Sequence, residues 1–592
     1  MKKRSNSWGV LRGSLLLIVV ALAVSGCSEP PGRLWLKAPG WGRAKYVAHT
    51  AVNDPASIAI DDLGRIYLLV VDRTEDLYRP RVIQLDRQLE RLWERTYDQA
   101  LTAIDQPRIL WNGEALQVFW ISRNSLYYSQ THPSGDYLGT PVVISGDIPV
   151  ESFDVAFDPD HGLTVWFAGT EEVPGLYAMP PGQLAGAPEL VDPLGLAPGI
   201  QYDDRGVLHT IWWHDDLVGS DNRIFYGAYP GGRFQPGRET NVYEVYLQPS
   251  DGFEGPFFGI DQDQAYILWT LSIRTGLRAG TIEASYLHFP LSEPTMVSRR
   301  RVVTVPVDFE LDYLSMEGVE LDTGERVSLT DSIAGRTSVV SNIAIQPGVG
   351  QELAIAGRVR VNYLMRKMEN QVAVIYFSNG SPISYQLLSF TATISTNPAI
   401  IRDDQGFLYF SWLEKIGESG RAVYLTSTSP DIRNSIRSLT LEDVRSLSVE
   451  ILFGMLMGVL MTPFAVIWVI APIIVLGLTY KIRREHESLT GLGTMVSIIL
   501  ALLAYWLSKV IILPTMWDYV PFSGWVPFIP EVLKTSLQIV VPLAIAVIGF
   551  VIAWNYTYRR ERNSAVFFTL LYVAVDAVLT MAIYGAIILG AI

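Results

Sequence analysis

The sequence predicts two kinds of domain in one chain: an all-β propeller of about seven blades, followed by an all-α transmembrane domain of four helices. Two observations support this prediction. A pattern of two alternating strands around a polar turn recurs between residues 50 and 430, and four long apolar runs follow residue 450. The chain has 592 residues, too many for one ordinary hydrophobic core, so at least two domains are expected.

The composition agrees with this division. The chain is 49% hydrophobic and 18% charged, and its mean hydropathy is positive, as expected when a soluble domain is joined to a membrane domain. The net charge of −14 argues against a nucleic-acid-binding protein, which presents a basic face to its partner. We therefore expect no nucleic-acid partner.

Residues 1–27 have the organisation of a secretory signal peptide. A basic stretch, MKKRSNSWGVLRGS, precedes the apolar run LLLIVVALAV and the small residues SGC. The run Val24-Ser25-Gly26-Cys27 resembles the lipobox of bacterial lipoproteins, which implies cleavage before Cys27 and attachment of lipid to its thiol. Cys27 is the only cysteine, so no disulfide forms within the chain. The alternative is an uncleaved N-terminal anchor; in either case residues after 28 lie outside the cytoplasm.

Residues 28–430 are interpreted as the propeller. Three stretches match one another best, namely 55–72, 198–214 and 398–414, and looser copies cover 106–122, 153–169, 256–272 and 362–380. Alternation with period two predicts strands, and a period of roughly 40–50 residues with strand pairs is typical of propeller blades. Residues 281–350 are poorly patterned and hold either an insertion or another blade.

The polar turn of the repeat is interpreted as structural, because a motif found in several blades serves the fold. Its aspartate is expected to accept hydrogen bonds from backbone N–H groups and its glycine to adopt a positive φ. The residues assigned to this turn are Asp62, Gly64, Asp204, Gly206, Asp404 and Gly406. Tryptophans that recur at similar offsets are expected to pack between blades: Trp120, Trp166, Trp212, Trp269 and Trp412.

The repeats resemble those of two known propeller families. The stretch 55–72 is similar to an NHL-type repeat through Pro55, Asp61, Gly64 and Tyr67. The later copies resemble the Asp-box of sialidase-like propellers, but they lack its Ser or Thr two residues before the aspartate and have Ile60, Tyr202 and Arg402 there. Such propellers include hydrolases, lyases, lectins and scaffolds, so the resemblance implies a fold and assigns no activity.

No motif in the sequence assigns a catalytic, cofactor-binding or metal-binding residue. The seven histidines are scattered, and there is no Gly-x-Ser-x-Gly elbow or phosphate-binding loop. Glycosidases need facing carboxylates, and sialidases also need an arginine cluster. Four charged residues lie near the expected blade entries, and none is assigned a role: Arg108, Asp154, Arg205 and Glu254.

Residues 451–592 are interpreted as the transmembrane domain. Apolar runs at 451–480, 494–513, 536–556 and 565–590 each provide about the 20 residues needed to span a bilayer. The basic loops KIRREHE (481–487) and YRRERN (558–563) are expected in the cytoplasm. The intervening loop has aromatic residues and no Lys or Arg. These signals predict a multi-pass protein of the bacterial plasma membrane with its propeller on the extracytoplasmic side.

Two charged residues interrupt these apolar runs, Lys509 and Asp576. Because intramembrane charges are costly unless paired, we expect them to form a buried pair between the second and fourth spans. In the alternative, Lys509 extends to the outer interface and Asp576 bonds a neighbouring helix. A role in an ion or proton pathway is the third interpretation.

The connector 431–450 is expected to contain a short juxtamembrane helix, because SLTLEDVRSLSVE has a capping-box pattern. Beyond it, Gly454 and Gly458 form a small-residue motif, and Pro463 and Pro472 predict kinks.

Three functional hypotheses follow. The first is a binding or scaffolding module for a protein or glycan partner at the cell envelope. The second is an envelope glycan hydrolase, and the third a ligand sensor or transport-associated membrane component.

Overall fold

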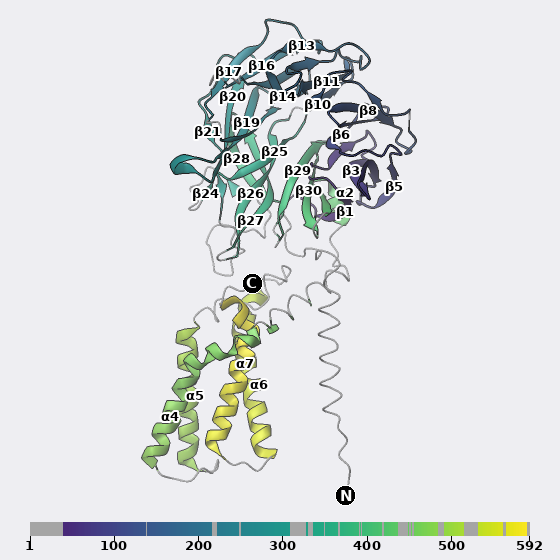
Figure 1. Ribbon diagram of the computed structural model, residues 1–592. Coiled ribbons are helices and arrows are strands. Elements are labelled where there is room, and N and C mark those ends of the chain that lie inside the picture. Colours follow the sequence, from purple (N-terminus) through teal and green to yellow (C-terminus); the bar gives the residue numbers. More distant parts are fainter. Residues whose placement is uncertain are drawn as a thin grey trace.

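The computed structural model confirms both predicted folds: a seven-bladed β-propeller, and four helices long and apolar enough to span a membrane (Figure 1). It describes residues 40–588 apart from 138, 216–221, 248–249, 308–326, 329–335, 348–349, 365–366, 390, 392, 417–419, 436–447, 449–451, 453–454, 457, 484–490, 514–530 and 560–563. The predicted signal peptide with Cys27, most of the connector and the three interhelical loops therefore lie outside the described residues.

Blades 1 to 5 are four-stranded antiparallel sheets in chain order. Blade 1 comprises β2 (Ser57–Ile60), β3 (Ile66–Thr74), β4 (Leu77–Leu85) and β5 (Arg91–Thr96). Blade 2 comprises β6 (Asp105–Trp111), β7 (Leu116–Ser122), β8 (Ser125–Thr131) and β9 (Val142–Val143). Blade 3 comprises β10 (Val150–Asp158), β11 (Gly162–Gly169), β12 (Leu176–Ala178) and β13 (Glu189–Asp192). Blade 4 comprises β14 (Gly195–Tyr202), β15 (Val207–His214), β16 (Asn222–Pro230) and β17 (Thr240–Val245). Blade 5 comprises β18 (Gly252–Ile260), β19 (Gln264–Ile273), β20 (Thr281–Pro290) and β21 (Arg301–Val302).

Blade 6 has an additional strand that the repeat pattern did not predict. Its sheet contains β25 (Val340–Ile345), β26 (Leu353–Leu364), β27 (Lys367–Ser378), β28 (Ser381–Leu387) and, at the outer edge, β23 (Val327–Ser328). The poorly patterned stretch 281–350 thus completes blade 5, supplies β23 and β25, and forms a two-stranded sheet from β22 (Val305–Pro306) and β24 (Arg336–Thr337). The repeat at 362–380 lies in β26 and β27, the second and third strands, whereas the other copies occupy the first and second.

Blade 7 joins the two ends of the propeller. It consists of β29 (Ser395–Arg402), β30 (Leu408–Ile416), β31 (Gly420–Ser427) and, at its outer edge, β1 (Lys45–Thr50). Strand β1 pairs antiparallel with β31, placing His49 opposite Ala422. The first strand of each blade is innermost, since β2 contacts β6 and β29, β10 contacts β14, and β18 contacts β14 and β25.

The core lies between neighbouring blades, because each sheet buries both faces against its neighbours. The five recurrent tryptophans all lie on second strands and are at most 2% exposed, as predicted for inter-blade packing. Trp166 of blade 3 lies 6.1 Å from Trp212 of blade 4, measured between ring centroids.

The helical domain follows α2 (Pro430–Ser435), which packs on β31. It contains η2 (Thr462–Ala465), α4 (Val466–Arg483), α5 (Leu492–Ile512), α6 (Glu531–Arg559) and α7 (Ala565–Ile588). Half of the apolar segment of α7 is buried against other helices (50%), compared with 22% in each other span, so α7 is the central helix.

The predicted small-residue contact involves α7. A Cβ atom on Gly458 would collide with the carbonyl oxygen of Met581, and Gly585 lies against Gly458, so the two backbones approach closely. Gly454 lies outside the described residues. Pro463 lies in the 3-10 turn η2 that precedes α4, and Pro472 lies inside α4.

Candidate functional site

The recurrent turn between the first and second strands is built around the first acidic residue of each pair. Asp203 Oδ1 accepts the N–H groups of Arg205 and Val207 at 2.9 and 2.8 Å. Asp61 and Asp403 make the same two bonds in blades 1 and 7. This corrects the assignment of the cap to Asp62, Asp204 and Asp404, which lie in the turn one position later. The glycines adopt positive φ as predicted: Gly64, Gly206 and Gly406.

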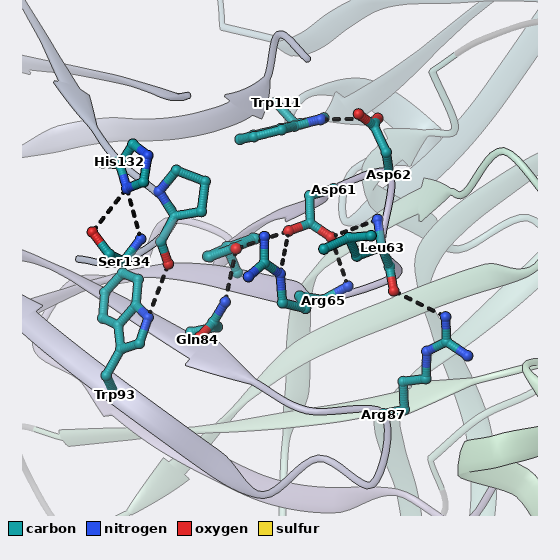
Figure 2. A network of polar contacts seen from close by, with 12 residues as sticks. Asp61, Asp62, Leu63, Arg65, Gln84, Arg87, Trp93, Trp111, His132 and Ser134 are labelled. Carbon is teal, nitrogen blue, oxygen red and sulfur yellow. Dashed lines mark hydrogen bonds and ion pairs between the residues drawn. The ribbon is translucent and has the colours of Figure 1, made fainter. Parts of the chain in front are cut away.

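The second oxygen of the capping aspartate contacts the following strand (Figure 2). Asp61 Oδ2 accepts hydrogen bonds from Arg65 Nε at 2.6 Å and from the Tyr67 hydroxyl at 2.9 Å, and Gln84 donates to that hydroxyl. Asp62 instead accepts the indole N–H of Trp111 from blade 2. These groups bond one another within the fold, which supports the structural interpretation of the turn.

His209 occupies the position that Tyr67 and Tyr409 occupy in blades 1 and 7. Its Nε2 lies 3.3 Å from Asp203 Oδ2, and its Nδ1 lies 2.6 Å from the Tyr226 hydroxyl. Burial lowers the pKa of His209, and Asp203 opposes that shift. The histidine is therefore held between two protein partners as part of the blade core.

The start of each inner strand, at the opposite edge of the blades, has a different local structure. The strand register shifts there in β6, β14, β18, β25 and β29. Four non-glycine residues at these bulges have φ between 47° and 50°: Gln106, Ala197, Asn342 and Asn397. Such backbone is costly for Gln106 and Ala197, whereas asparagine adopts it more readily, and bulges of this kind often re-aim groups next to binding sites.

Three carboxylates near the axis lie at these bulges, beside the backbone of the next blade. Asp154 in blade 3 accepts the N–H of Ile200 in blade 4 at 2.9 Å, which joins the two blades. Asp54, just ahead of β2, lies near the backbone N–H of Gln106 in blade 2, which favours its ionised form and lowers its pKa. The backbone N–H of Asn342 in blade 6 acts in the same direction on the pKa of Glu254 in blade 5.

Four charged residues from blades 1 to 3 come together here, and we name them the axial cluster: Asp54, Asp105, Arg108 and Asp154. Burial raises the pKa of Asp54, the charge of Asp105 raises it further, and Arg108 opposes the rise. Burial also raises the pKa of Asp154, again opposed by Arg108. Arg108 is exposed and lies within electrostatic reach of both carboxylates, while Asp54 and Asp154 are half-buried.

Blades 5 and 6 contribute a pair of opposite charges, Glu254 and Arg358. Burial raises the pKa of Glu254 and lowers that of Arg358 in blade 6, and each charge opposes the shift of the other. Arg358 Nε also donates to Ser341 Oγ at 3.0 Å.

Three of the four charged residues noted in the sequence lie on the innermost strands at this edge of the blades: Arg108, Asp154 and Glu254. The fourth, Arg205, lies in the turn at the other edge of blade 4, with its Nε 3.5 Å from Asp203 Oδ2. Sequence reasoning missed Asp54, which precedes its strand. Its only signal was its place immediately before the first repeat, at Asn53-Asp54-Pro55.

The structure brings the two intramembrane charges together. Lys509 Nζ lies 2.6 Å from Asp576 Oδ1, and both side chains are fully buried, so Lys509 does not extend to the interface. The Tyr505 hydroxyl donates to the same oxygen at 2.6 Å, and the Trp506 ring lies 4.8 Å from Lys509 Nζ. These contacts compensate the charge of Lys509 on α5 with that of Asp576 on α7.

Within the described residues, no group of three or more His, Cys, Asp or Glu side chains has metal-binding geometry. The axial cluster nevertheless combines an exposed guanidinium donor with carboxylate acceptors. Such a set can bind hydroxyl, amide or carboxylate groups of a ligand. A carboxyl group with a raised pKa beside another carboxylate can also donate a proton.

No family model matches this sequence, and neither does any curated protein. Solved structures with a similar fold include the propeller of Dos1 (8% identity, 65% of this chain and 96% of that chain, TM-score 0.35). Another is an α-L-arabinofuranosidase from Fusarium graminearum (8% identity, 64% of this chain and 98% of that chain, TM-score 0.35). A third is the Trypanosoma rangeli sialidase (10% identity, 69% of this chain and 58% of that chain, TM-score 0.29). At these identities the likeness concerns the fold alone, and at these TM-scores it carries no argument about activity.

Proposed function

We propose that this chain is a bacterial envelope protein whose propeller is a binding or scaffolding module for a protein or glycan partner. In this proposal the propeller lies outside the cytoplasm. The four helices hold it in the plasma membrane, and lipid on Cys27 provides a second attachment. Residues 28–430 would be the binding domain, 431–450 the connector and 451–592 the membrane domain.

The observation that supports a binding role is the position of Arg108. It is exposed on the innermost strand of blade 2, with carboxylates of blades 1 and 3 within electrostatic reach. Because the backbone N–H of Ile200 holds Asp154, this acceptor is preorganised, which reduces the entropy lost on binding.

Exposed apolar side chains lie at the same edge of the blades. In a four-stranded meander, the loop that leads into the first strand and the loop that follows the second strand share one edge. Tyr246 precedes β18 and is 77% exposed, and Leu277 follows β19 and is fully exposed. A face that combines aromatic, aliphatic and charged groups suits a protein or glycan surface.

The test is capture of the partner by the full-length protein. The protein is crosslinked mildly in its own membranes and purified, and the proteins and glycans that accompany it are identified by mass spectrometry. We expect a near-stoichiometric partner with the wild type, and at least tenfold less of it with Arg108→Glu.

The matched control is Arg205→Glu, which makes the same charge change at the opposite edge of a blade and should capture as well as the wild type. Equal capture by all three proteins would place the contact away from the axial cluster. Absence of any partner with the wild type would contradict the scaffolding proposal.

One observation favours a second candidate, glycan hydrolysis. The carboxyl group of Asp54 has a raised pKa and lies within electrostatic reach of Asp105, a combination that can supply a general acid and a base or nucleophile. Under this alternative, Asp54→Asn abolishes release of reducing sugar from envelope glycans, and Asp204→Asn leaves it unchanged. Equal rates in both variants, or no release by the wild type, would eliminate it.

A further inference from the structure

Three fully buried side chains on α7 each have an oxygen atom with no hydrogen-bond partner in the described part of the chain. These atoms are Thr569 Oγ1, Asp576 Oδ2 and Thr580 Oγ1. The residues are seven and four positions apart, so they lie on one face of the helix. At about 1.5 Å per residue this stripe extends over roughly 16 Å, half of a hydrocarbon core about 30 Å thick.

Three other hydroxyl groups in the membrane helices do not share this property. Those of Thr479, Ser497 and Thr557 donate to the carbonyl oxygen four residues earlier in their own helices, at 2.9, 3.0 and 2.7 Å. That bond is the usual way to satisfy a threonine or serine where no water is present. The hydroxyls of Thr569 and Thr580 make no such bond, although they are at least as deeply buried as that of Thr557.

The two carboxylate oxygens of Asp576 also differ in whether they have a hydrogen-bond donor. Lys509 and Tyr505 both donate to its Oδ1, and Oδ2 receives no donor among the described residues. A buried carboxylate oxygen without a donor is costly, so this atom needs a small donor that reaches the bundle interior. Because Lys509 already compensates the charge of Asp576, a neutral donor suits the site better than a metal cation.

We propose that the face of α7 from Thr569 to Thr580 lines a hydrated intramembrane site. Its ligands are water molecules, with Asp576 Oδ2 as the central acceptor. A buried water is held by polar partners within hydrogen-bond reach. The three oxygens are too far apart along α7 to share one water, so each anchors its own along this face. The site gives Asp576 contact with water in the middle of the bundle, and it is independent of the function proposed for the propeller.

The test measures water access by cysteine reactivity in membranes that contain the full-length protein. Methanethiosulfonate ethylammonium reacts with the thiolate, which forms only where water is present. We expect Thr580→Cys and Thr569→Cys to be modified at least tenfold faster than Ala582→Cys. Ala582 is the matched control because it is buried, is apolar and lies nearer than Thr580 to the end of α7.

The parent chain measures any contribution from Cys27, and a single symmetric peak in size-exclusion chromatography shows that each variant has folded. Two positions are tested so that loss of one variant leaves the other informative. If both threonine-derived cysteines react as slowly as Ala582→Cys, the stripe is dry and the proposal is wrong. If all three react equally fast, access follows depth alone, which also overturns it.

Discussion

At the scale of single residues, the two acids of the repeated turn have different surroundings. Asp203 is 9% exposed and accepts two backbone N–H groups through one oxygen, whereas the neighbouring Asp204 is exposed. The same division occurs at Asp403 and Asp404 in blade 7. A carboxylate that satisfies turn donors stabilises the turn, and an exposed acid one position later adds little.

Asp203→Ala and Asp204→Ala form a matched pair that tests this division. We expect Asp203→Ala to lower the free energy of unfolding of the propeller by about 2 kcal/mol, because two hydrogen bonds to a charged acceptor are lost. Asp204→Ala should change it by less than about 0.5 kcal/mol. Urea unfolding followed by tryptophan fluorescence measures both. Equal effects of the two substitutions would contradict the conclusion that only the first acid caps the turn.

Asp154 provides a prediction about pH. Because burial raises its pKa above that of the unfolded chain, the folded protein binds this proton more tightly. Its contribution to stability is therefore fully present below the unfolded value near about 4, and is lost as pH rises through the folded value.

Asp154→Asn keeps an oxygen to accept the N–H of Ile200 and removes the titration. As the pH rises above about 4, wild-type stability should consequently fall more steeply than that of the variant. Denaturant unfolding at several pH values gives the two slopes, and parallel slopes would contradict the raised pKa.

At the scale of elements, two contacts between segments far apart in the chain organise the protein. Strand β1 completes blade 7 beside β31, so unfolding one end of the propeller opens the other. In the helical domain, the pair formed by Lys509 and Asp576 connects α5 to the central helix α7. A buried ion pair adds little net stability, but removing one partner leaves an uncompensated charge.

Reversal of both charges tests the connection between α5 and α7. Lys509→Asp and Asp576→Lys alone should each cost about 3–5 kcal/mol, since each buries two like charges together. The double variant restores an opposite pair and should recover most of the folded, monodisperse protein. Thermal unfolding in detergent ranks the three variants. A double variant no more stable than the worse single variant would show that the pair does not connect the helices.

At the scale of the whole molecule, a propeller and a helical bundle share one chain and bury their side chains in different ways. Each blade buries both faces against its neighbours, whereas α4, α5 and α6 present exposed leucine, isoleucine and valine side chains that a bilayer would cover. The charge pattern of the interhelical loops, which lie outside the described residues, predicts the orientation of this bundle.

Cysteines placed in two of these loops test the predicted orientation. In sealed right-side-out vesicles, an impermeant maleimide should label Ser523→Cys, and it should label Ser488→Cys only after detergent is added. The parent chain reports any background from Cys27. The reverse pattern would place the propeller in the cytoplasm and would remove the basis for an envelope partner.

The sequence by itself determined the class of each domain, because the signals are local. Strand alternation and a repeat of 40–50 residues predicted the propeller, and the length of the apolar runs predicted the four helices. The contact between Lys509 and Asp576 was also predictable, since two isolated charges in hydrocarbon need each other. Arg108, Asp154 and Glu254 could be placed near blade entries from the sequence but could not be assigned partners.

Tertiary structure alone decided how the blades are joined. The side chain of Asn397 donates to the carbonyl of Asn53, and Asp154 accepts the N–H of Ile200, contacts that no repeat pattern encodes. It also decided that the first acid caps each turn, that β23 extends blade 6, and that β1 completes blade 7. The physical reason is that these contacts connect residues on different strands and blades. Their geometry arises only when the ring closes, whereas periodicity describes each segment separately.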